Sequence, residues 1–339
     1  MIKMALELSN AQRAEVLTQA LPYIQKYYKK IIVIKYGGNA MINEELKQQV
    51  MEDIVLLSLI GVKVVLVHGG GPEITDMLKK IGKESVFVDG LRVTDKETAE
   101  IVQMVLAGKI NKSLVNLLEI KGGKAMGISG MDGHMIEAVP KNEKLGYVGK
   151  ITKVNVEPIT DLLDHGYIPV VSTVGCDGDG NVYNINADTA AAYIAGAMNA
   201  ERLITMTDIE GILRDKDDPD SLIPCVDIEK AGELFRDGTI SGGMIPKVEC
   251  CIEAIHRGVK KVIILDGRVP HALLIETLTD EGAGTMVTGD KNDESYTKGR
   301  RIYRRDLRPL SHSYNRGERL SFKGRGGQRV HRFRHGYRR

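Results

Sequence analysis

The sequence has no long apolar run, no signal-peptide pattern and no cysteine framework. No stretch of about 18 uninterrupted apolar residues occurs, so we expect no membrane-spanning helix. The N-terminus lacks the basic and then apolar segments of a secretory signal. The four cysteines (Cys176, Cys225, Cys250 and Cys251) form no C-x-x-C pair and no zinc spacing, which predicts reduced thiols and no metal site. These absences favour a cytoplasmic globular protein.

The turn after the first predicted strand also lacks the two common nucleotide-binding motifs, G-x-x-x-x-G-K-[ST] and G-x-G-x-x-G. Residues 31–34 are four consecutive β-branched residues, which predict a strand buried on both faces of a parallel sheet. That strand leads into Lys35-Tyr36-Gly37-Gly38. The next predicted strand, residues 62–67, leads into His68-Gly69-Gly70-Gly71-Pro72. The sequence therefore predicts two neighbouring strands that both end in glycine-rich turns.

Glycine-rich turns at this edge of a parallel sheet are suited to binding anions. Ligands bind at the carboxyl ends of the strands in open α/β sheets. Glycines let backbone N–H groups approach phosphate oxygens, and Lys35 adds a mobile positive charge. Either turn alone could equally be a tight connection between two elements. Together with the lysine, the two turns favour phosphate chemistry.

Strands and helices alternate along most of the chain. Apolar residues at helical spacing in 46–57, followed by Gly61, predict a helix with a glycine after its C-terminus. Further strands are predicted at 168–172, 203–207 and 262–265, and helices at 187–198 and 272–278. The pattern predicts an α/β fold: a three-layer α/β/α sandwich around a central, mainly parallel open sheet.

Two segments interrupt this alternation. Residues 89–95 are predicted to be a polar loop, and the turn-rich segment 124–186 is predicted to form β-hairpins. Within it, residues 177–181 (Asp-Gly-Asp-Gly-Asn) resemble the start of a calcium loop. They lack the later glutamate of that motif, so a hairpin turn is the better interpretation.

A helix with a kink is predicted before the first strand. Ser9 and Gln12 have the spacing of a capping box, and Pro22 interrupts the apolar stripe that follows. The helix could dock on a partner subunit, or it could pack on its own domain.

The C-terminal segment differs sharply in charge. Residues 300–339 contain 13 Arg and one Lys against one Asp and one Glu, a net charge of +12, so residues 1–299 carry −10. Few aliphatic residues occur there, which predicts a disordered basic tail over 299–339. Such a tail could bind nucleic acid if it is native, or it could be a non-native extension.

Several segments together resemble the acetylglutamate kinases of the amino-acid kinase superfamily, in the family's order over residues 23–288. They are Lys35-Tyr36-Gly37-Gly38-Asn39-Ala40, His68-Gly69-Gly70-Gly71-Pro72, Asp89-Gly90-Leu91-Arg92-Val93-Thr94, Leu106-Ala107-Gly108-Lys109-Ile110-Asn111-Lys112, Tyr183-Asn184-Ile185-Asn186-Ala187-Asp188, Thr207-Asp208-Ile209-Glu210-Gly211 and Gly242-Gly243-Met244 with Lys247. The resemblance implies the amino-acid kinase fold and transfer of the ATP γ-phosphoryl group to the side-chain carboxylate of N-acetyl-L-glutamate, a step of arginine biosynthesis.

The resemblance also implies roles for single residues. Lys35 and Lys247 would stabilise the transferring phosphoryl group, and Asp188 would hold both lysines by charge-assisted hydrogen bonds. Gly70, Gly71, Arg92 and Asn184 would bind the acetylated substrate. Gly37, Gly38, Asp208, Gly211 and Gly243 would bind ATP, whose phosphates would carry Mg²⁺ with no dedicated protein metal site.

The kinked helix is similar to that of the arginine-inhibited members, which form dimers interlaced into hexamers. The resemblance then implies an L-arginine site near Tyr23, Glu276 and Gly284, although Leu278 stands where phenylalanine is common. A PII-type regulator is a further implied partner. We expect residues 1–30 to serve oligomerisation and regulation, and 31–290 to form the kinase domain. Its N-terminal lobe, about 31–200, would bind acetylglutamate, and its C-terminal lobe, about 201–290, would bind ATP.

Two alternatives remain open from the sequence alone. One is an amino-acid kinase with a different acceptor, and the other is a non-catalytic arginine sensor or RNA-binding scaffold that uses the basic tail. The presence of Lys35, Asp188 and Lys247 favours catalysis over the second alternative.

Overall fold

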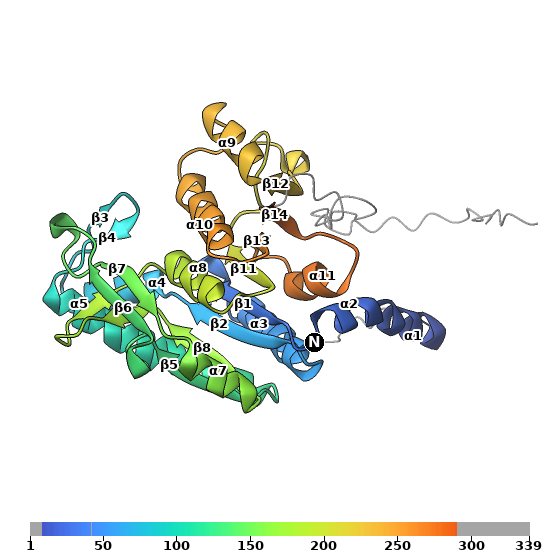
Figure 1. The fold of residues 1–339 in the computed structure, drawn as a ribbon, viewed down its shortest axis with the longest axis horizontal. Helices are drawn as coiled ribbons and strands as arrows, with labels where there is room; N and C mark the ends of the chain where they lie inside the picture. The colour runs from blue at the N-terminus through green and yellow to red at the C-terminus, as the bar shows by residue number, and fades with distance from the viewer. Residues whose placement is uncertain (1–8, 42, 290–339) are drawn as a thin grey trace, which may run out of the picture. The chain divides into compact units, whose positions relative to one another are not determined.

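The computed structural model describes residues 9–41 and 43–289, and the predicted basic tail (299–339) lies outside this part of the chain. Its centre is an eight-stranded sheet with the order β12-β14-β13-β11-β1-β2-β8-β5 (Figure 1). From β13 to β5 all neighbouring pairs are parallel. In that order the eight strands are Cys225–Asp227, Gly284–Thr288, Lys261–Asp266, Arg202–Thr207, Ile31–Tyr36, Lys63–His68, Ile168–Ser172 and Ala125–Ser129.

Strand β14 lies inside the sheet although it is the last strand of the described residues. It pairs antiparallel with β13 and parallel with β12, so it separates these two strands. The register places Val287 beside Val262 on one side and beside Val226 on the other. All three side chains are buried.

The sheet has a hydrophobic core on each face, because successive strand residues point to opposite sides. In β1, Ile32 and Ile34 belong to one core and Val33 to the other. The first core is covered by α3 (Glu44–Leu59), α4 (Gly71–Lys80), α5 (Lys96–Gln103), the π-helix Met104–Ile110, α6 (Asn111–Ile120) and α11 (Ala272–Leu278). The second is covered by α7 (Glu157–Asp164), α8 (Ala187–Ala197), α9 (Ile228–Arg236) and α10 (Met244–His256). The predicted three-layer α/β/α fold is confirmed.

The turn-rich segment 124–186 is more varied than the predicted hairpins. A second sheet, with the order β10-β9-β6-β7, does contain antiparallel pairs. Its strands in that order are Val182–Asn184, Val174–Cys176, Ile136–Pro140 and Gly149–Val154. The prediction was wrong for β5, which joins the main sheet, and for α7. Helix α7 forms because Pro158 suits a first helical turn, and because Ile159 and Leu163 share one buried face.

The predicted loop 89–95 begins with a small hairpin instead. Strands β3 (Phe87–Val88) and β4 (Leu91–Arg92) pair antiparallel. Asp89 and Gly90 connect them, with φ angles of 49° and 76°. Both are left-handed, as a tight two-residue hairpin turn requires. This turn places Arg92 at the end of a strand.

The N-terminal helix is divided into α1 (Asn10–Gln19) and α2 (Leu21–Tyr27). The predicted capping box is present, since Ser9 and Gln12 each accept a backbone N–H of the other. The break falls at Ala20, two residues before Pro22. Tyr27 of α2 is buried, whereas α1 has no buried residue.

The remaining helical elements are short 3₁₀ turns. The 3₁₀ turns are Gly38–Met41, Asp132–His134, Glu143–Leu145 and Pro219–Ser221. Among residues 9–41 and 43–289, no helix combines the length and the apolar character that crossing a bilayer requires.

Candidate active site

A cleft lies where the strand order changes direction. The chain runs from β1 to β2 on one side, and β11 lies on the other side of β1. The carboxyl ends of such strands form the ligand-binding edge of an open α/β sheet. The cleft has a volume of about 280 Å³ and is lined by Lys35, Gly37, Gly38, Gly69, Gly70, Gly71, Pro72, Ile74, Phe87, Gly90, Leu91, Arg92, Leu106, Val148, Thr173, Asn184, Ile185, Asn186, Ala187 and Asp188.

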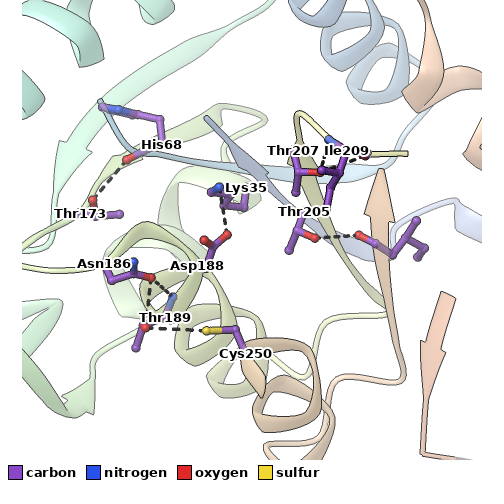
Figure 2. A network of polar contacts seen from close by, with 11 residues as sticks. Lys35, His68, Thr173, Asn186, Asp188, Thr189, Thr205, Thr207, Ile209 and Cys250 are labelled. Atoms are coloured by element: carbon purple, nitrogen blue, oxygen red, sulfur yellow. Dashed lines mark hydrogen bonds and ion pairs between the residues drawn. The ribbon is translucent and has the colours of Figure 1, made fainter. Parts of the chain in front are cut away.

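Lys35 and Asp188 form an ion pair in this cleft. The Lys35 ammonium lies 2.9 Å from Asp188 Oδ1, and their side chains are 9% and 20% exposed. Figure 2 shows the two groups facing each other, with Asp188 in the first turn of α8. Asn186 caps that helix by accepting the Thr189 N–H at 3.0 Å. Strand β1 and the cap of α8 thus fix the two charges.

The charges of two lysines keep Asp188 ionised. Burial alone would raise the pKa of this carboxyl group, but Lys35 and Lys247 together lower it below its ordinary value. Lys247 is in the first turn of α10, and α10 packs against α8. The ion pairs of the described residues join Asp188 to Lys35 and not to Lys247. Lys247 also does not line the cleft. The structure therefore places Lys247 within electrostatic range of Asp188 rather than in contact with it.

Arg92 is a second positively charged residue of the cleft, and protein contacts hold its side chain in place. Its guanidinium donates to the Gly71 carbonyl oxygen and to Thr75 Oγ1, both at 2.9 Å, and to Ser85 Oγ. The Phe87 ring lies 4.7 Å from the guanidinium carbon. Burial lowers the pKa of Arg92, although an arginine stays protonated in proteins. The structure therefore presents a fixed positive group.

Thr94 joins two of the predicted substrate-binding residues. Its hydroxyl donates to the Arg92 carbonyl oxygen at 2.8 Å and accepts from Asn184 Nδ2 at 3.2 Å. Thr94 is fully buried, so these contacts are shielded from water. The sequence analysis did not assign Thr94 a role, and the only signal was its place two residues after Arg92.

The structure brings together eight of the twelve predicted catalytic, substrate and ATP residues. Those that line the cleft are Lys35, Gly37, Gly38, Gly70, Gly71, Arg92, Asn184 and Asp188. The other four (Lys247, Asp208, Gly211 and Gly243) do not line it. Apolar lining residues such as Phe87, Val148 and Ile185 were not predicted, because an apolar side chain carries no chemical signal in the sequence.

The predicted ATP residues outside the cleft lie at neighbouring strand and helix ends. Asp208 and Gly211 follow β11, and Figure 2 shows the Thr207–Ile209 turn at that strand end. Gly211 has φ +145°, and a Cβ there would lie 2.6 Å from Thr285 Oγ1, so the position requires glycine. Gly243 immediately precedes α10 and has open space around it.

The predicted regulatory residues lie around α11. Glu276 is buried, pairs with Arg202 Nη1 at 3.1 Å, and accepts the Ala283 N–H at 3.1 Å. Gly284 follows Ala283 as the first residue of β14. Tyr23 is on α2, which packs against α11. Tyr23 and Glu276 are therefore on elements that contact each other, and Gly284 follows the residue whose N–H Glu276 accepts.

Metal-binding groups do not gather in the described residues. No cluster of three or more His, Cys, Asp or Glu side chains there could hold a metal ion.

Comparisons with known proteins decide the family. Residues 30–266 match the model of the amino acid kinase family. The acetylglutamate kinase of Brachyspira hyodysenteriae is 57% identical over 285 residues, which cover 84% of this chain and 99% of that protein. The acetylglutamate kinase of Clostridioides difficile is 55% identical over 279 residues, with 82% and 98% covered. The chain belongs to the acetylglutamate kinase family. It is therefore a kinase.

Two solved structures resemble the fold of this chain. N-acetylglutamate synthase from Neisseria gonorrhoeae, complexed with coenzyme A and N-acetyl-glutamate, matches with a TM-score of 0.71 and 25% identity, covering 82% of this chain and 64% of that chain. Carbamate kinase from Giardia lamblia bound to AMP-PNP matches with a TM-score of 0.56 and 19% identity, covering 77% and 99%. The second likeness concerns the fold alone.

Proposed function

We propose that this kinase transfers the γ-phosphoryl group of ATP to the side-chain carboxylate of N-acetyl-L-glutamate. The observation that carries the proposal is one cleft that contains the fixed Arg92 guanidinium and the Lys35–Asp188 pair. Membership of the acetylglutamate kinase family supports the same substrates.

The reaction needs positioning and charge stabilisation rather than a base. A carboxylate oxygen of the acceptor attacks the γ-phosphorus, and the bond between that phosphorus and the bridging oxygen breaks. ADP leaves with the electron pair, and no proton has to move. Lys35 would stabilise the charge on the transferring group, and Asp188 would hold the ammonium in place. Lys247 would reach the same group from α10.

Arg92 and Asn184 would orient the acceptor. A guanidinium matches the geometry of a carboxylate, so Arg92 would bind the α-carboxylate. Asn184 offers both donor and acceptor atoms to the acetamido group. Because Thr94 contacts both residues, their relative placement is set before the substrate binds. Gly70 and Gly71 would offer backbone N–H groups to the acceptor.

The nucleotide would lie along the strand ends beside the cleft. Gly37, Gly38, Asp208, Gly211 and Gly243 would border it, and the start of α10 would face its phosphates. Kinases of this family use ATP with Mg²⁺, and the ion neutralises phosphate charge when it is bound.

Regulation by L-arginine is the second part of the proposal. A basic ligand would compete for the Glu276 carboxylate near Gly284 and Tyr23, where Arg202 now provides the positive partner. Exposed apolar side chains on α1 and α2 favour contact with a second copy, in a dimer or hexamer. A PII-type regulator would bind the assembled enzyme, and the basic tail would bind nucleic acid only if it is native.

The test is ATP turnover with N-acetyl-L-glutamate, L-glutamate or L-aspartate, each with and without L-arginine. We expect turnover of the acetylated substrate alone, suppressed by arginine. Turnover without suppression would reject the regulatory site and keep the kinase. No turnover with any acceptor would reject the catalytic proposal and favour a sensor or scaffold.

The variant Lys247→Ala sharpens this test. We expect a fall in kcat by a factor of about 100 or more, because one charge that stabilises the transition state is lost. Lys230→Ala, which removes an exposed ammonium paired with Glu233 on α9, is the matched control and should leave kcat unchanged. A normal kcat in Lys247→Ala would remove Lys247 from the mechanism.

A further inference from the structure

His68 is a buried residue at the end of β2, directly before the glycine-rich turn. Its relative exposure is 0%. Nδ1 of its ring lies 2.9 Å from the Gly69 carbonyl oxygen, and Nε2 lies 3.2 Å from Asn111 Nδ2. Its main-chain oxygen accepts from Thr173 Oγ1 at 3.4 Å (Figure 2). Each polar atom of the ring therefore has one protein neighbour.

The contacts of Asn111 decide which ring nitrogen carries the proton. Asn111 Nδ2 also lies 2.8 Å from the Val170 carbonyl oxygen and 3.3 Å from that of Ile128. Carbonyl oxygens only accept hydrogen bonds, so this end of the amide must be the NH₂ group. His68 Nε2 is then an acceptor, and Nδ1–H donates to Gly69. Burial lowers the pKa of His68 to about 4, which keeps the ring neutral.

The carbonyl oxygens of the glycine turn are all occupied by protein donors. Gly69 accepts from His68 Nδ1, Gly70 accepts from the Ile74 N–H at 3.0 Å, and Gly71 accepts from Arg92 Nη2 at 2.9 Å. In contrast, the N–H groups of Gly70 and Gly71 have no hydrogen-bond acceptor among residues 9–41 and 43–289. With its acceptors engaged and its donors available, the turn suits an anionic oxygen.

The π-helix Met104–Ile110 packs against the glycine turn at Gly70. A Cβ added to Gly70 would lie 2.1 Å from Ile110 Cδ1 and 2.8 Å from Leu106 Cδ2. Asn111 follows Ile110 directly and starts α6. The same π-helical segment therefore fixes the position of Gly70 and of the amide that contacts His68. Segments of π-helix are rare and occur often at functional sites.

We propose that His68 is a positioning residue for the phosphoryl acceptor, and that Asn111 selects its Nδ1–H tautomer. The ring N–H holds the Gly69 carbonyl oxygen away from the anion, so that the N–H groups of Gly70 and Gly71 remain available to an acceptor carboxylate. This inference rests on the proposed function for the identity of the acceptor.

The first test is spectroscopic and needs no substrate. In the full chain labelled with ¹⁵N-histidine, the signals of His68 are assigned by their loss in His68→Asn. We expect a neutral ring with the proton on Nδ1 from pH 8 to pH 5. A proton on Nε2, or protonation of the ring within that range, would overturn the proposal. The result does not depend on whether N-acetyl-L-glutamate is the acceptor.

The second test compares two replacements of the ring. The amide nitrogen of Asn can take the place of Nδ1 and donate to Gly69, whereas the longer Gln side chain places its amide near Nε2. We expect His68→Asn to retain the KM for N-acetyl-L-glutamate within about threefold, and His68→Gln to raise it about tenfold, as the loss of one hydrogen bond predicts. The KM for ATP should change in neither variant.

A structural effect would give a different pattern. Loss of folded protein lowers the apparent kcat and leaves both KM values unchanged. Ser172→Ala is the matched control: Ser172 pairs with His68 in the neighbouring strand, and its buried hydroxyl has no partner in the described residues, so activity should be unchanged. Equal KM values for His68→Asn and His68→Gln would overturn the proposal. No turnover by the unmodified protein would instead reject the proposed function.

Discussion

Among single residues, the positive side chains of the cleft already have hydrogen-bond or ion-pair partners in the protein before a substrate binds. The Lys35 ammonium has Asp188 at 2.9 Å, and Arg92 has three oxygen acceptors. Compensation allows positive groups to lie in a partly buried site without a large desolvation cost. It also fixes their positions, so little reorganisation is needed during phosphoryl transfer.

Asp188→Asn tests this compensation. We expect kcat to fall about 100-fold or more, because Lys35 loses its anchor. The unfolding free energy at pH 7 should fall by about 3 kcal/mol, as for a buried pair broken on one side. Because the folded pKa of Asp188 is lowered, its stabilising contribution is present at neutral pH and is lost as the pH falls through that pKa.

The control for Asp188→Asn is Asp164→Asn. Asp164 pairs with Lys63 at 2.8 Å, but its side chain is 58% exposed. Kinetic assays should show an unchanged kcat, and urea unfolding should show only a small loss of stability, because an exposed ion pair contributes little. Similar losses in both variants would contradict a special role for the cleft pair.

Among helices and strands, contacts between residues far apart in the sequence determine packing and pKa shifts that the local sequence does not predict. Helix α3 and the start of α11 meet through Asp53 and His271, whose Oδ1 and Nδ1 lie 2.6 Å apart. Asp53 is buried, and its Oδ2 has no hydrogen-bond partner in the described residues. Burial raises the pKa of Asp53 to about 6, although His271 opposes this shift.

Asp53→Asn should remove the loss of folding stability that ionisation of the buried Asp53 carboxyl group causes as the pH rises. The folded pKa of Asp53 is raised, so its contribution to stability is full below about pH 4 and decreases as the pH rises to about 6. Between pH 4 and pH 7, the unfolding free energy of the unmodified protein should fall relative to that of the variant by on the order of 2 kcal/mol. Chemical unfolding across this range measures the difference.

Glu52→Gln is the control for the Asp53 prediction. Glu52 neighbours Asp53 in α3, but its side chain is 48% exposed and pairs with Lys121. No pH-dependent difference of that size should appear in this variant. Parallel pH profiles for Asp53→Asn and the unmodified protein would contradict the raised pKa.

Sequence patterns predicted elements whose signal is local and missed those set by long-range contacts. Residues 272–278 were predicted as a helix and form α11 with the same bounds, because apolar spacing marks its buried face. The π-helix was missed, since its residues have the apolar spacing of an ordinary helix, and the closeness of Ile110 and Leu106 to Gly70 is visible only in the folded chain. Arg92 and Asn184 were predicted, but Thr94 became apparent only when the two residues were seen to share it.

At the scale of the whole molecule, the N-terminal helices carry apolar side chains that the described fold does not cover. Val16, Leu17 and Leu21 are 56%, 74% and 51% exposed. The capping box stabilises α1 although α1 buries none of its own side chains. A preformed helix with exposed aliphatic groups suits the proposed contact with a second copy of the chain.

Leu17→Asp combined with Leu21→Asp tests that contact. We expect a smaller assembly by light scattering after size exclusion, because charges at a buried contact would be desolvated. Gln19→Asp with Gln25→Asp, two exposed polar positions on the same helices, is the control and should leave the mass unchanged. An unchanged mass in the leucine variant would place the contact elsewhere.

The position of β14 has a consequence for synthesis on the ribosome. Because this strand lies between β12 and β13, the nascent chain cannot close that part of the sheet until Thr288 has emerged. Until then, both strands present unpaired backbone groups, and Val262 and Val226 lack their common neighbour. Translation that stops before Gly284 should therefore yield chains that depend on chaperones, whereas the β1, β2, β8 and β5 half can assemble earlier.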